Sequence, residues 1–340
     1  MLITYIRSSS YNNYSYCQMQ YFITYVLGHL SVSGKKADTG TVVHKTLEAL
    51  AGLKKYYQLN PNDNKILLTD DVLGEIVMSR GDLMNPHMVE DLLHKSYDYY
   101  TTKSSHRWTR ADEKTCLGLV WDTLTFNDGQ FDPRLRNVID PEPHFDIPIE
   151  EDWAHYDYTL PDGKRITGQL AIKGTIDLVT ELSSDVIEVV DWKTGRRLDW
   201  ATGEVKDYKK LCNDAQLLLY NYAITKLYPQ YKQSIMTIFF VKDGGPFSMC
   251  FDRSDNEKFL RMLREKYETI KKNDRPRLIS PDRSSWKCSK LCHYAKNNWP
   301  NTNHSICEHV DTYIKINGID RAVKDLSREG HTVNFYEAPG

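Results

Sequence analysis

Apolar residues recur at helical spacing near the start of the chain. Residues 10–30 are rich in aromatics and predict a short helix. Residues 39–57 predict a second helix, with Thr39 as its N-cap. One face of this second helix carries apolar residues three or four positions apart, namely Val42, Val43, Leu47 and Leu50. Two early helices follow from this pattern.

The same periodicity continues between residues 60 and 136. Clusters of Asn, Asp, Pro and Gly divide this region into separate pieces. The pieces with helical periodicity are residues 70–80, 88–102 and 110–126. We therefore expect a helical subdomain or insertion here.

Short segments rich in β-branched residues, with turn residues between them, replace the helical pattern beyond residue 136. They are residues 137–149, 165–182, 185–195, 234–245 and 247–252. Residues 216–229 predict a helix packed on the resulting sheet, and residues 256–273 predict a charged amphipathic helix after it. The pattern indicates a mixed sheet flanked by helices, and the final thirty or so residues give no prediction.

Composition and charge narrow the function. The 340 residues are 40% hydrophobic and 26% charged, which is typical of a soluble globular protein. No run of eighteen apolar residues occurs, and the first residues lack the apolar stretch of a secretory signal, so we expect a cytosolic protein. The formal net charge of −2 gives no global positive field, so any nucleic-acid site must be a local patch.

One candidate patch is the stretch of residues 261–287, which contains nine basic and four acidic residues. Two interpretations are open: a solvated helix face with a basic loop, or a phosphate track with Tyr267 and Trp286 stacking on bases. The basic residues are Arg261, Arg264, Lys266, Lys271, Lys272, Arg275, Arg277, Arg283 and Lys287, and the acidic ones Glu265, Glu268, Asp274 and Asp282. A smaller basic group is formed by Lys206, Lys209 and Lys210.

Two segments carry the candidate chemistry. Asp177 and Asp191 lie on consecutive predicted strands, which would form a hairpin with its turn near residues 183–185. The two carboxylates would then meet at one end of the sheet. Lys193 projects to the same face as Asp191, and Trp192 to the other. Such carboxylates suit Mg²⁺ or Mn²⁺, although an exposed cross-strand pair would give the same spacing.

Further motifs accompany these residues in a fixed order. They are Gly-x-x-x-His ending at His44, Gly-x-x-Asp ending at Asp177, Asp191-x-Lys193 and Gln216-x-x-x-Tyr220. A Ser-rich approach to Cys17, followed by aromatics, precedes them. In this order the sequence resembles the PD-(D/E)XK nuclease superfamily, specifically its RecB/AddB-like branch with CRISPR-associated and phage-encoded relatives. The resemblance covers roughly residues 8–310.

The resemblance implies a fold and roles for single residues. The fold would be α/β, with a restriction-endonuclease-like PD-(D/E)XK core, a helical insertion and a C-terminal iron–sulfur clasp. His44, Asp177 and Asp191 would bind Mg²⁺ or Mn²⁺, and Lys193 would be the catalytic lysine. Gln216 and Tyr220 would contact DNA or order the site. Glu142 matches an acidic position of many relatives, but a solvated carboxylate is an equal interpretation.

The cysteines give a second metal-binding hypothesis. Seven is an odd number and export is not indicated, so clustered cysteines are better interpreted as metal ligands than as disulfides, and Cys116, Cys212 and Cys250 as packing residues. Relatives often hold a 4Fe-4S cluster with one early and three late cysteines, which the resemblance assigns to Cys17, Cys288, Cys292 and Cys307. The late cysteines are spaced more loosely than in relatives, so Zn²⁺ remains an alternative, with His293, His304 or His309 as substitute ligands.

The function implied by the resemblance is a metal-dependent DNA exonuclease for single-stranded or frayed ends, in recombination, repair or replication. The alternatives are a structure-specific endonuclease of the same fold and a non-catalytic protein that binds DNA ends. We expect a bacterial cytoplasm, including that of a phage-infected cell, as its location, no membrane partner, and a helicase or recombinase as a candidate partner. No phosphate-binding loop of the helicase kind occurs, so any unwinding must come from another chain.

The expected organisation has five parts. Residues 1–59 hold the N-terminal helices, with the first cluster cysteine and the metal-binding histidine. Residues 60–136 form the insertion and residues 137–260 the nuclease core. Residues 261–310 supply the basic helix and cysteine cluster, and residues 311–340 a tail.

Overall fold

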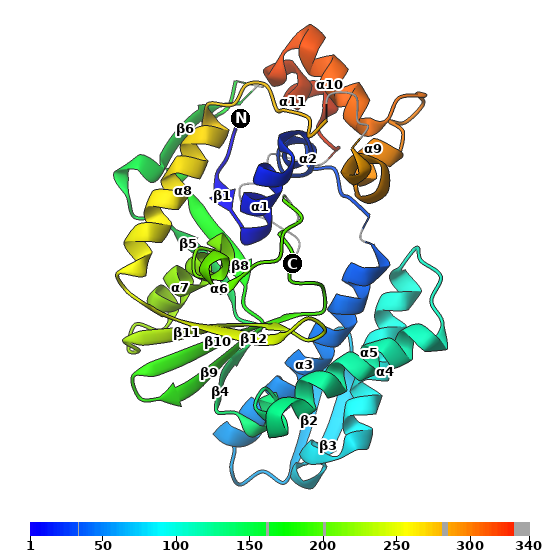
Figure 1. Ribbon diagram of the computed structural model, residues 1–340, viewed down its shortest axis with the longest axis vertical. Helices are drawn as coiled ribbons and strands as arrows, with labels where there is room; N and C mark the ends of the chain where they lie inside the picture. The colour runs from blue at the N-terminus through cyan, green and yellow to red at the C-terminus, as the bar shows by residue number, and fades with distance from the viewer. Residues whose placement is uncertain (33, 161–162, 200–201, 281–284, 330–340) are drawn as a thin grey trace.

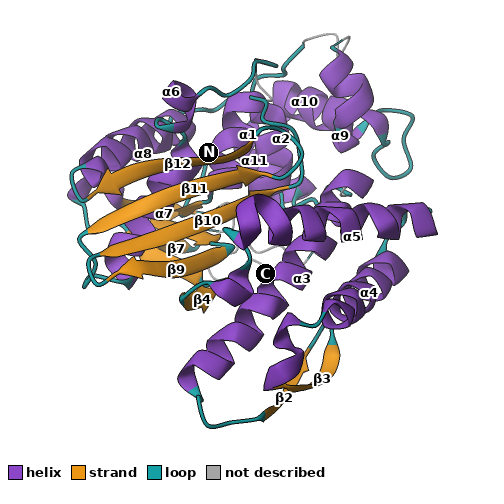
Figure 2. Ribbon diagram, turned by 60° about the horizontal axis from the view of Figure 1, so that its bottom comes forward, coloured by secondary structure: helices purple, strands orange, loops and turns teal. Residues whose placement is uncertain are grey.

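A mixed five-stranded sheet forms the centre of the molecule, with helices on both of its faces (Figures 1 and 2). The computed structural model describes residues 1–32, 34–160, 163–199, 202–280 and 285–329. The strand order is β12-β11-β10-β9-β4, and all neighbours are antiparallel except β10 and β11. The strands are β4 (Val138–Pro141), β9 (Leu178–Ser183), β10 (Val186–Lys193), β11 (Gln233–Phe240) and β12 (Gly245–Asp252). The predicted mixed sheet flanked by helices is confirmed.

Strand β10 is buried on both faces, because each face packs against its own hydrophobic core. Ile187 and Val189 belong to the core formed with helices α7 (Ala215–Leu227) and α8 (Asp255–Lys271). Val190 and Trp192 belong to a second core, formed with helices α3 (Lys35–Leu59), α4 (Pro86–Lys103) and α5 (Arg110–Thr125). A strand covered on both faces is apolar on both, so its few polar residues stand out.

Two long strands of the prediction are broken: residues 137–149 form two strands and residues 165–182 form three, and the breaks carry the chain from one sheet into another. Strand β4 continues into β5 (His144–Pro148), and β8 (Ala171–Thr175) continues into β9. Strands β5 and β8 join β1 (Tyr5–Ile6) in a separate three-stranded sheet. At the bend, the Glu142 amide donates to the Asp177 carbonyl at 3.1 Å and the Ile176 amide to the Pro143 carbonyl at 3.1 Å. This bend places Asp177 at the junction of the two sheets.

The N-terminal helices differ in detail from the prediction. The segment predicted as one helix is α1 (Ser8–Tyr16), α2 (Gln18–Tyr21) and a further turn (Phe22–Val26). The break falls at Cys17, whose backbone is extended. Thr39 as N-cap is wrong, because α3 begins at Lys35 after Gly34. The predicted apolar face of α3 is buried, as expected.

The predicted helix at residues 70–80 is also wrong. Strands β2 (Lys65–Asp70) and β3 (Gly74–Ser79) form an antiparallel hairpin there, with Ile76 and Met78 buried on alternate positions of β3. The Asp70 carboxylate accepts from the amides of Val72 and Leu73 and so stabilises the turn, which closes at Gly74 with φ +67°. The other two predicted helices of the insertion are present as α4 and α5.

The C-terminal part packs against the N-terminal helices. The C-terminal part consists of the short helix α9 (His293–Lys296), followed by α10 (Ile306–Asn317) and α11 (Ile319–Leu326). Earlier in the chain, β6 (His155–Thr159) pairs with β7 (Arg165–Gln169), and the short helix α6 (Tyr208–Leu211) precedes α7. The His29 ring hydrogen-bonds the Leu326 carbonyl at 2.7 Å, and the Arg328 amide donates to the Leu27 carbonyl at 2.9 Å. Segments from both ends of the chain thus lie side by side (Figure 1). Within the described ranges, no helix is long and apolar enough to cross a membrane.

Candidate active site

Side chains from four separate segments meet at the end of the sheet where β10 finishes. His44 comes from α3, Asp177 from the bend between β8 and β9, Asp191 and Lys193 from β10, and Gln216 and Tyr220 from α7. Asp191 and Lys193 share one face of β10, and Trp192 lies in the core on the other. The structure therefore brings all six residues singled out from the sequence into one place.

Asp177 is held from two sides. Its Oδ1 lies 3.4 Å from Nδ1 of His44, and its Oδ2 accepts a hydrogen bond from the Trp192 amide at 2.8 Å. Burial raises the pKa of Asp177, but the imidazole of His44 and the ammonium of Lys193 outweigh that effect and lower it. The same contact holds the pKa of His44 above its usual value, although burial opposes it. Asp177 is therefore an anionic carboxylate with a fixed orientation.

Asp191 is almost completely buried, with 1% of its side chain exposed. Burial raises its pKa to about 6, in spite of the Lys193 ammonium 2.6 Å from its Oδ2. Conversely, burial disfavours the charged form of Lys193, but the two carboxylates prevail and raise the pKa of the lysine. Burial thus makes the ionised form of Asp191 less stable, and the Lys193 ammonium beside it offsets part of that effect.

Gln216 and Tyr220 form a chain of hydrogen bonds that ends on Asp191. Gln216 Nε2 donates to Asp191 Oδ1 at 3.1 Å and to the Tyr220 hydroxyl at 2.8 Å. The Tyr220 hydroxyl in turn donates to the Thr175 carbonyl at 2.9 Å. Burial raises the pKa of Tyr220 well above its ordinary value, so the hydroxyl stays protonated and able to donate. This chain fixes the orientation of the Asp191 carboxylate.

The donor set fits a hard divalent cation. Asp191 Oδ2 is buried and its neighbour is the Lys193 ammonium at 2.6 Å, so a metal at this oxygen would share it with the lysine. Carboxylate oxygens and an imidazole nitrogen are ligands that Mg²⁺ and Mn²⁺ accept. In the described ranges, no three His, Cys, Asp or Glu side chains are yet close enough together to hold a metal. Lys193 and His44 instead lie against the carboxylates.

A second carboxylate pair, not predicted from the sequence as a pair, lies beside this site. Glu48 follows His44 by one helical turn and hydrogen-bonds Glu142, whose amide contacts the Asp177 carbonyl. Burial, and after it the contact with Glu142, raises the pKa of Glu48 to about 7. Lys45 bridges Glu48 and Asp70 at 2.8 Å each, which ties the β2–β3 hairpin to α3. The i, i+4 spacing of His44 and Glu48 was the signal that could have revealed Glu48.

The four cysteines of the cluster hypothesis come from the two ends of the chain. Cys17, Cys288 and Cys292 all lie near Tyr16, whose pKa is raised to about 12 by burial first and then by these thiols. Cys307 is buried on α10, in the same hydrophobic core. Burial also raises the pKa of Cys292. Cys17, Cys288 and Cys292 therefore share one region, and in the part of the chain described no group of three or more ligands forms a metal site.

The basic stretch is partly used inside the protein. Lys266 donates to the Ser15 hydroxyl at 2.7 Å and lies over the Tyr11 ring at 4.4 Å. Tyr267 is fully buried, so stacking on bases through it is wrong, whereas Trp286 is 56% exposed. Lys206 and Lys210 form ion pairs with Asp214 and Glu204. Arg283 and Asp282 lie outside the described residues.

A basic hollow of about 820 Å³ nevertheless remains between α8 and the loop that follows it. Its charged lining consists of Lys272, Asp274, Arg275, Arg277, Asp311 and Lys315. Lys315 pairs with Asp311 at 2.6 Å and Lys272 with Glu268 at 3.4 Å, so the excess positive charge of the hollow comes from Arg275 and Arg277 beside Asp274.

A mixed sheet that ends in two carboxylates and a lysine, with a histidine and a glutamine beside them, describes a metal-assisted hydrolase site. The family model of the PD-(D/E)XK nuclease superfamily matches residues 8–296, and the chain belongs to that superfamily. It is therefore a nuclease by family, and such nucleases typically use Mg²⁺ or Mn²⁺. The match includes every residue of the site and three of the four cluster cysteines, and stops before Cys307. No individually curated protein matches the chain at a significant level.

Proposed function

We propose that this chain is a Mg²⁺- or Mn²⁺-dependent DNA exonuclease that hydrolyses phosphodiester bonds at single-stranded or frayed ends. The observation that carries the proposal is the convergence of His44, Asp177, Asp191 and Lys193 at one sheet end. Membership of the PD-(D/E)XK nuclease superfamily supports hydrolysis of nucleic acid. The basic hollow beside α8 supports a polyanionic substrate.

Each side chain has a task that its contacts suit. His44, Asp177 and Asp191 would hold the metal, which supplies Lewis-acid stabilisation of the phosphate and makes a bound water more acidic. Lys193, half-buried beside Asp191, would orient the attacking water and stabilise the charge that builds up on the phosphate. Gln216 keeps the Asp191 carboxylate in place through Oδ1, which leaves Oδ2 to be shared by the metal and Lys193.

The direct test compares end-labelled linear single-stranded DNA with circular single-stranded DNA, each with Mg²⁺ or Mn²⁺. The variants are Asp191→Ala and Lys193→Ala. Asp185→Ala is the matched control, because Asp185 is exposed at the far end of the same hairpin. We expect nucleotide release from linear DNA only, lost in both site variants and kept in the control.

Other outcomes select the other functions. Cleavage of circular DNA would make the protein an endonuclease. Binding of DNA ends without cleavage of any substrate by either metal would make it an end-binding protein. Equal cleavage by wild type and Lys193→Ala would remove Lys193 from the mechanism, since a lysine that stabilises charge in the transition state contributes about 10²–10³-fold.

We also propose that Cys17, Cys288, Cys292 and Cys307 bind a 4Fe-4S cluster that ties the two ends of the chain together. The support is the common location of Cys17, Cys288 and Cys292 near Tyr16, and the hydrogen bonds that already join residues 27–29 to residues 326–328. Thiolates are the ligands of such clusters. Iron and acid-labile sulfide measured in anaerobically purified protein test this. Stoichiometric zinc in place of iron would assign a zinc site, and neither metal would remove the proposal.

The role that goes with this activity is processing of DNA ends in recombination, repair or replication in a bacterial cytoplasm, next to a helicase or recombinase. A pull-down with the active-site variant Asp191→Ala, which would retain its substrate, tests the partner. Recovery of neither a helicase nor a recombinase with DNA present would contradict that part of the proposal.

A further inference from the structure

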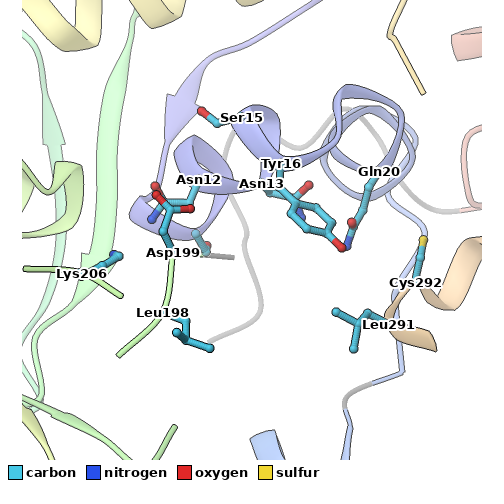
Figure 3. A pocket seen from close by; sticks show the side chains of 11 residues that line it. Asn12, Asn13, Ser15, Tyr16, Gln20, Leu198, Asp199, Lys206, Leu291 and Cys292 are labelled. Carbon is cyan, nitrogen blue, oxygen red and sulfur yellow. The ribbon is translucent and has the colours of Figure 1, made fainter. Parts of the chain in front are cut away.

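A cavity of about 520 Å³ lies between helices α1 and α2, the loop after β10 and the segment around Cys292 (Figure 3). Its volume falls within the roughly 300–1,000 Å³ typical of small-ligand sites. Its described lining contains none of His44, Asp177, Asp191 and Lys193, and Cys292 is the one proposed cluster ligand among the described residues that line it. In the view of Figure 3, Tyr16, Gln20 and Cys292 lie toward one end, and Asn12, Asp199 and Lys206 toward the other. The cavity is therefore a separate feature of the molecule.

Two buried oxygens of its lining lack a hydrogen-bond partner in the described structure. They are Oδ1 of Asn13 and Oε1 of Gln20. Native proteins leave few buried acceptors without a donor, because each one costs free energy. Both oxygens are buried in the cavity wall, and the terminal torsion of each amide is soft enough for the oxygen to turn toward a ligand. A ligand that donates hydrogen bonds would satisfy both.

The remaining lining offers the kinds of contact that a nucleobase makes. The Tyr16 ring offers an aromatic surface, while Leu198 and Leu291 offer apolar contact. Carboxamides carry a donor and an acceptor side by side, as the edges of bases do. Proteins recognise unpaired bases by this combination of stacking and hydrogen bonds to the base edge.

The cavity is also within reach of a strand held at the catalytic residues. Leu198 follows Lys193 by five positions, so the two lie at most about 17 Å apart. That is the length of about five stacked nucleotides. Moreover, Lys206 of the lining pairs with Asp214, which caps α7 by accepting from the Gln216 amide. Asp214 at the N-terminus of α7 thus contacts both Lys206 in the cavity wall and Gln216 in the catalytic site.

We propose that this cavity binds one base of the single strand that is being degraded, and that it prefers adenine, cytosine or guanine to thymine. Asn13 and Gln20 both present acceptors, and those three bases carry an amino group that donates. Thymine has no amino group and offers a single ring N–H. The proposal rests on the proposed function for its ligand, single-stranded DNA, and adds a base preference at one position.

The test measures binding in EDTA, so that no strand is cut. Labelled all-thymine oligonucleotides are compared with ones that carry a single adenine or cytosine at each position in turn. Wild type should bind the oligonucleotide with adenine or cytosine at one particular position about tenfold more tightly than it binds all-thymine DNA. Asn13→Ala and Gln20→Ala should bind that oligonucleotide no more tightly than all-thymine DNA. Gln230→Ala, at an exposed amide on the turn after α7, should keep the preference.

A change at the ring separates stacking from edge recognition. Tyr16→Leu should weaken binding of every sequence about tenfold, because stacking does not depend on base identity. Melting temperature and iron content of each variant identify any that misfold or lose a cluster. The wild-type scan needs no variant, so equal affinity at every position overturns the proposal by itself.

The two proposals fail separately. A base preference in wild type without cleavage of any DNA would uphold the cavity and reject the nuclease activity. Cleavage of linear DNA together with equal binding of all sequences would uphold the nuclease and reject the cavity.

Discussion

The catalytic residues and the four cysteines are both groups of metal ligands, yet the structure holds them together differently. In the first group, opposite charges meet: Lys193 lies 2.6 Å from Asp191, and His44 lies 3.4 Å from Asp177. In the second group the members are alike, and burial raises the pKa of Cys292, which favours the neutral thiol. Neutral thiols attract one another little, whereas ion pairs in a buried site attract strongly.

This difference predicts opposite behaviour when a metal is absent. The catalytic group has its own cations in place of the metal, so its arrangement does not depend on metal binding. At the cysteine group, a bound cluster would contribute directly to folding. Changes in the first group should therefore affect chemistry more than stability, and changes in the second should do the reverse.

The largest expected effect comes from Asp191→Asn. Asparagine keeps the shape and can still accept from Gln216, but it removes the charge that binds the metal. Hydrolysis of linear DNA should fall on the order of a thousandfold, with a melting temperature within a few degrees of wild type. Initial rates at saturating Mn²⁺ and a thermal melt measure both. A melting temperature that collapses along with the rate would show that the site also holds the fold together.

The next largest effect is on stability, from Cys292→Ser. Loss of one ligand should release the iron and lower the melting temperature by roughly 10 °C, since structural metal sites contribute several kcal/mol. Cys250→Ser, at an exposed cysteine of β12, is the matched control and should change neither. If iron is retained in Cys292→Ser, this cysteine is not a ligand.

The sequence alone predicts those features of the site that depend on local periodicity. Asp191 and Lys193 could be assigned to one face of a strand because side chains alternate along any strand, and β10 keeps that rule. Gln216 and Tyr220 are one helical turn apart and meet in the structure for the same local reason. Periodicity of this kind needs no knowledge of the rest of the fold.

Features that depend on distant contacts were missed. Residues 70–80 have an apolar spacing that suits a helix, but the turn that Asp70 stabilises makes them a hairpin. Tyr267 looked available to bases, but it is buried against the rest of the core. The Glu48–Glu142 pair joins residues 94 positions apart, from a helix and a bend that no local pattern connects.

That carboxylate pair gives a smaller, pH-dependent prediction. Glu48 has its pKa raised from 4.5 to about 7, so the folded protein keeps a proton that the unfolded chain releases. Stability from this group is therefore lost as the pH rises from about 4.5 to 7. Glu48→Gln removes that loss and can still donate to Glu142. In EDTA it should stabilise the protein by about 1–2 kcal/mol at pH 8, with allowance for partial exposure, and not at pH 4.

Unfolding in urea at the two pH values measures the difference between Glu48→Gln and wild type. Glu308→Gln, at a glutamate of α10 far along the chain, serves as control and should show no such rise with pH. A stabilisation that is equal at pH 4 and pH 8 would mean that the Glu48 proton is not the cause.

Tyr220→Phe should have the smallest effect, and it should affect both stability and rate, because Tyr220 connects Thr175 of the sheet to Gln216 beside Asp191. The hydroxyl accepts from Gln216 and donates to the Thr175 carbonyl, so its loss leaves Gln216 with Asp191 as its remaining partner in this chain of hydrogen bonds. We expect about 1 kcal/mol of lost stability and a rate reduced about three- to tenfold, because the Asp191 carboxylate is held less firmly. Tyr222→Phe, on the same helix outside this chain, should leave the rate unchanged. A rate for Tyr220→Phe equal to that of Tyr222→Phe would show that the charge of Lys193, and not the chain of hydrogen bonds, orients Asp191.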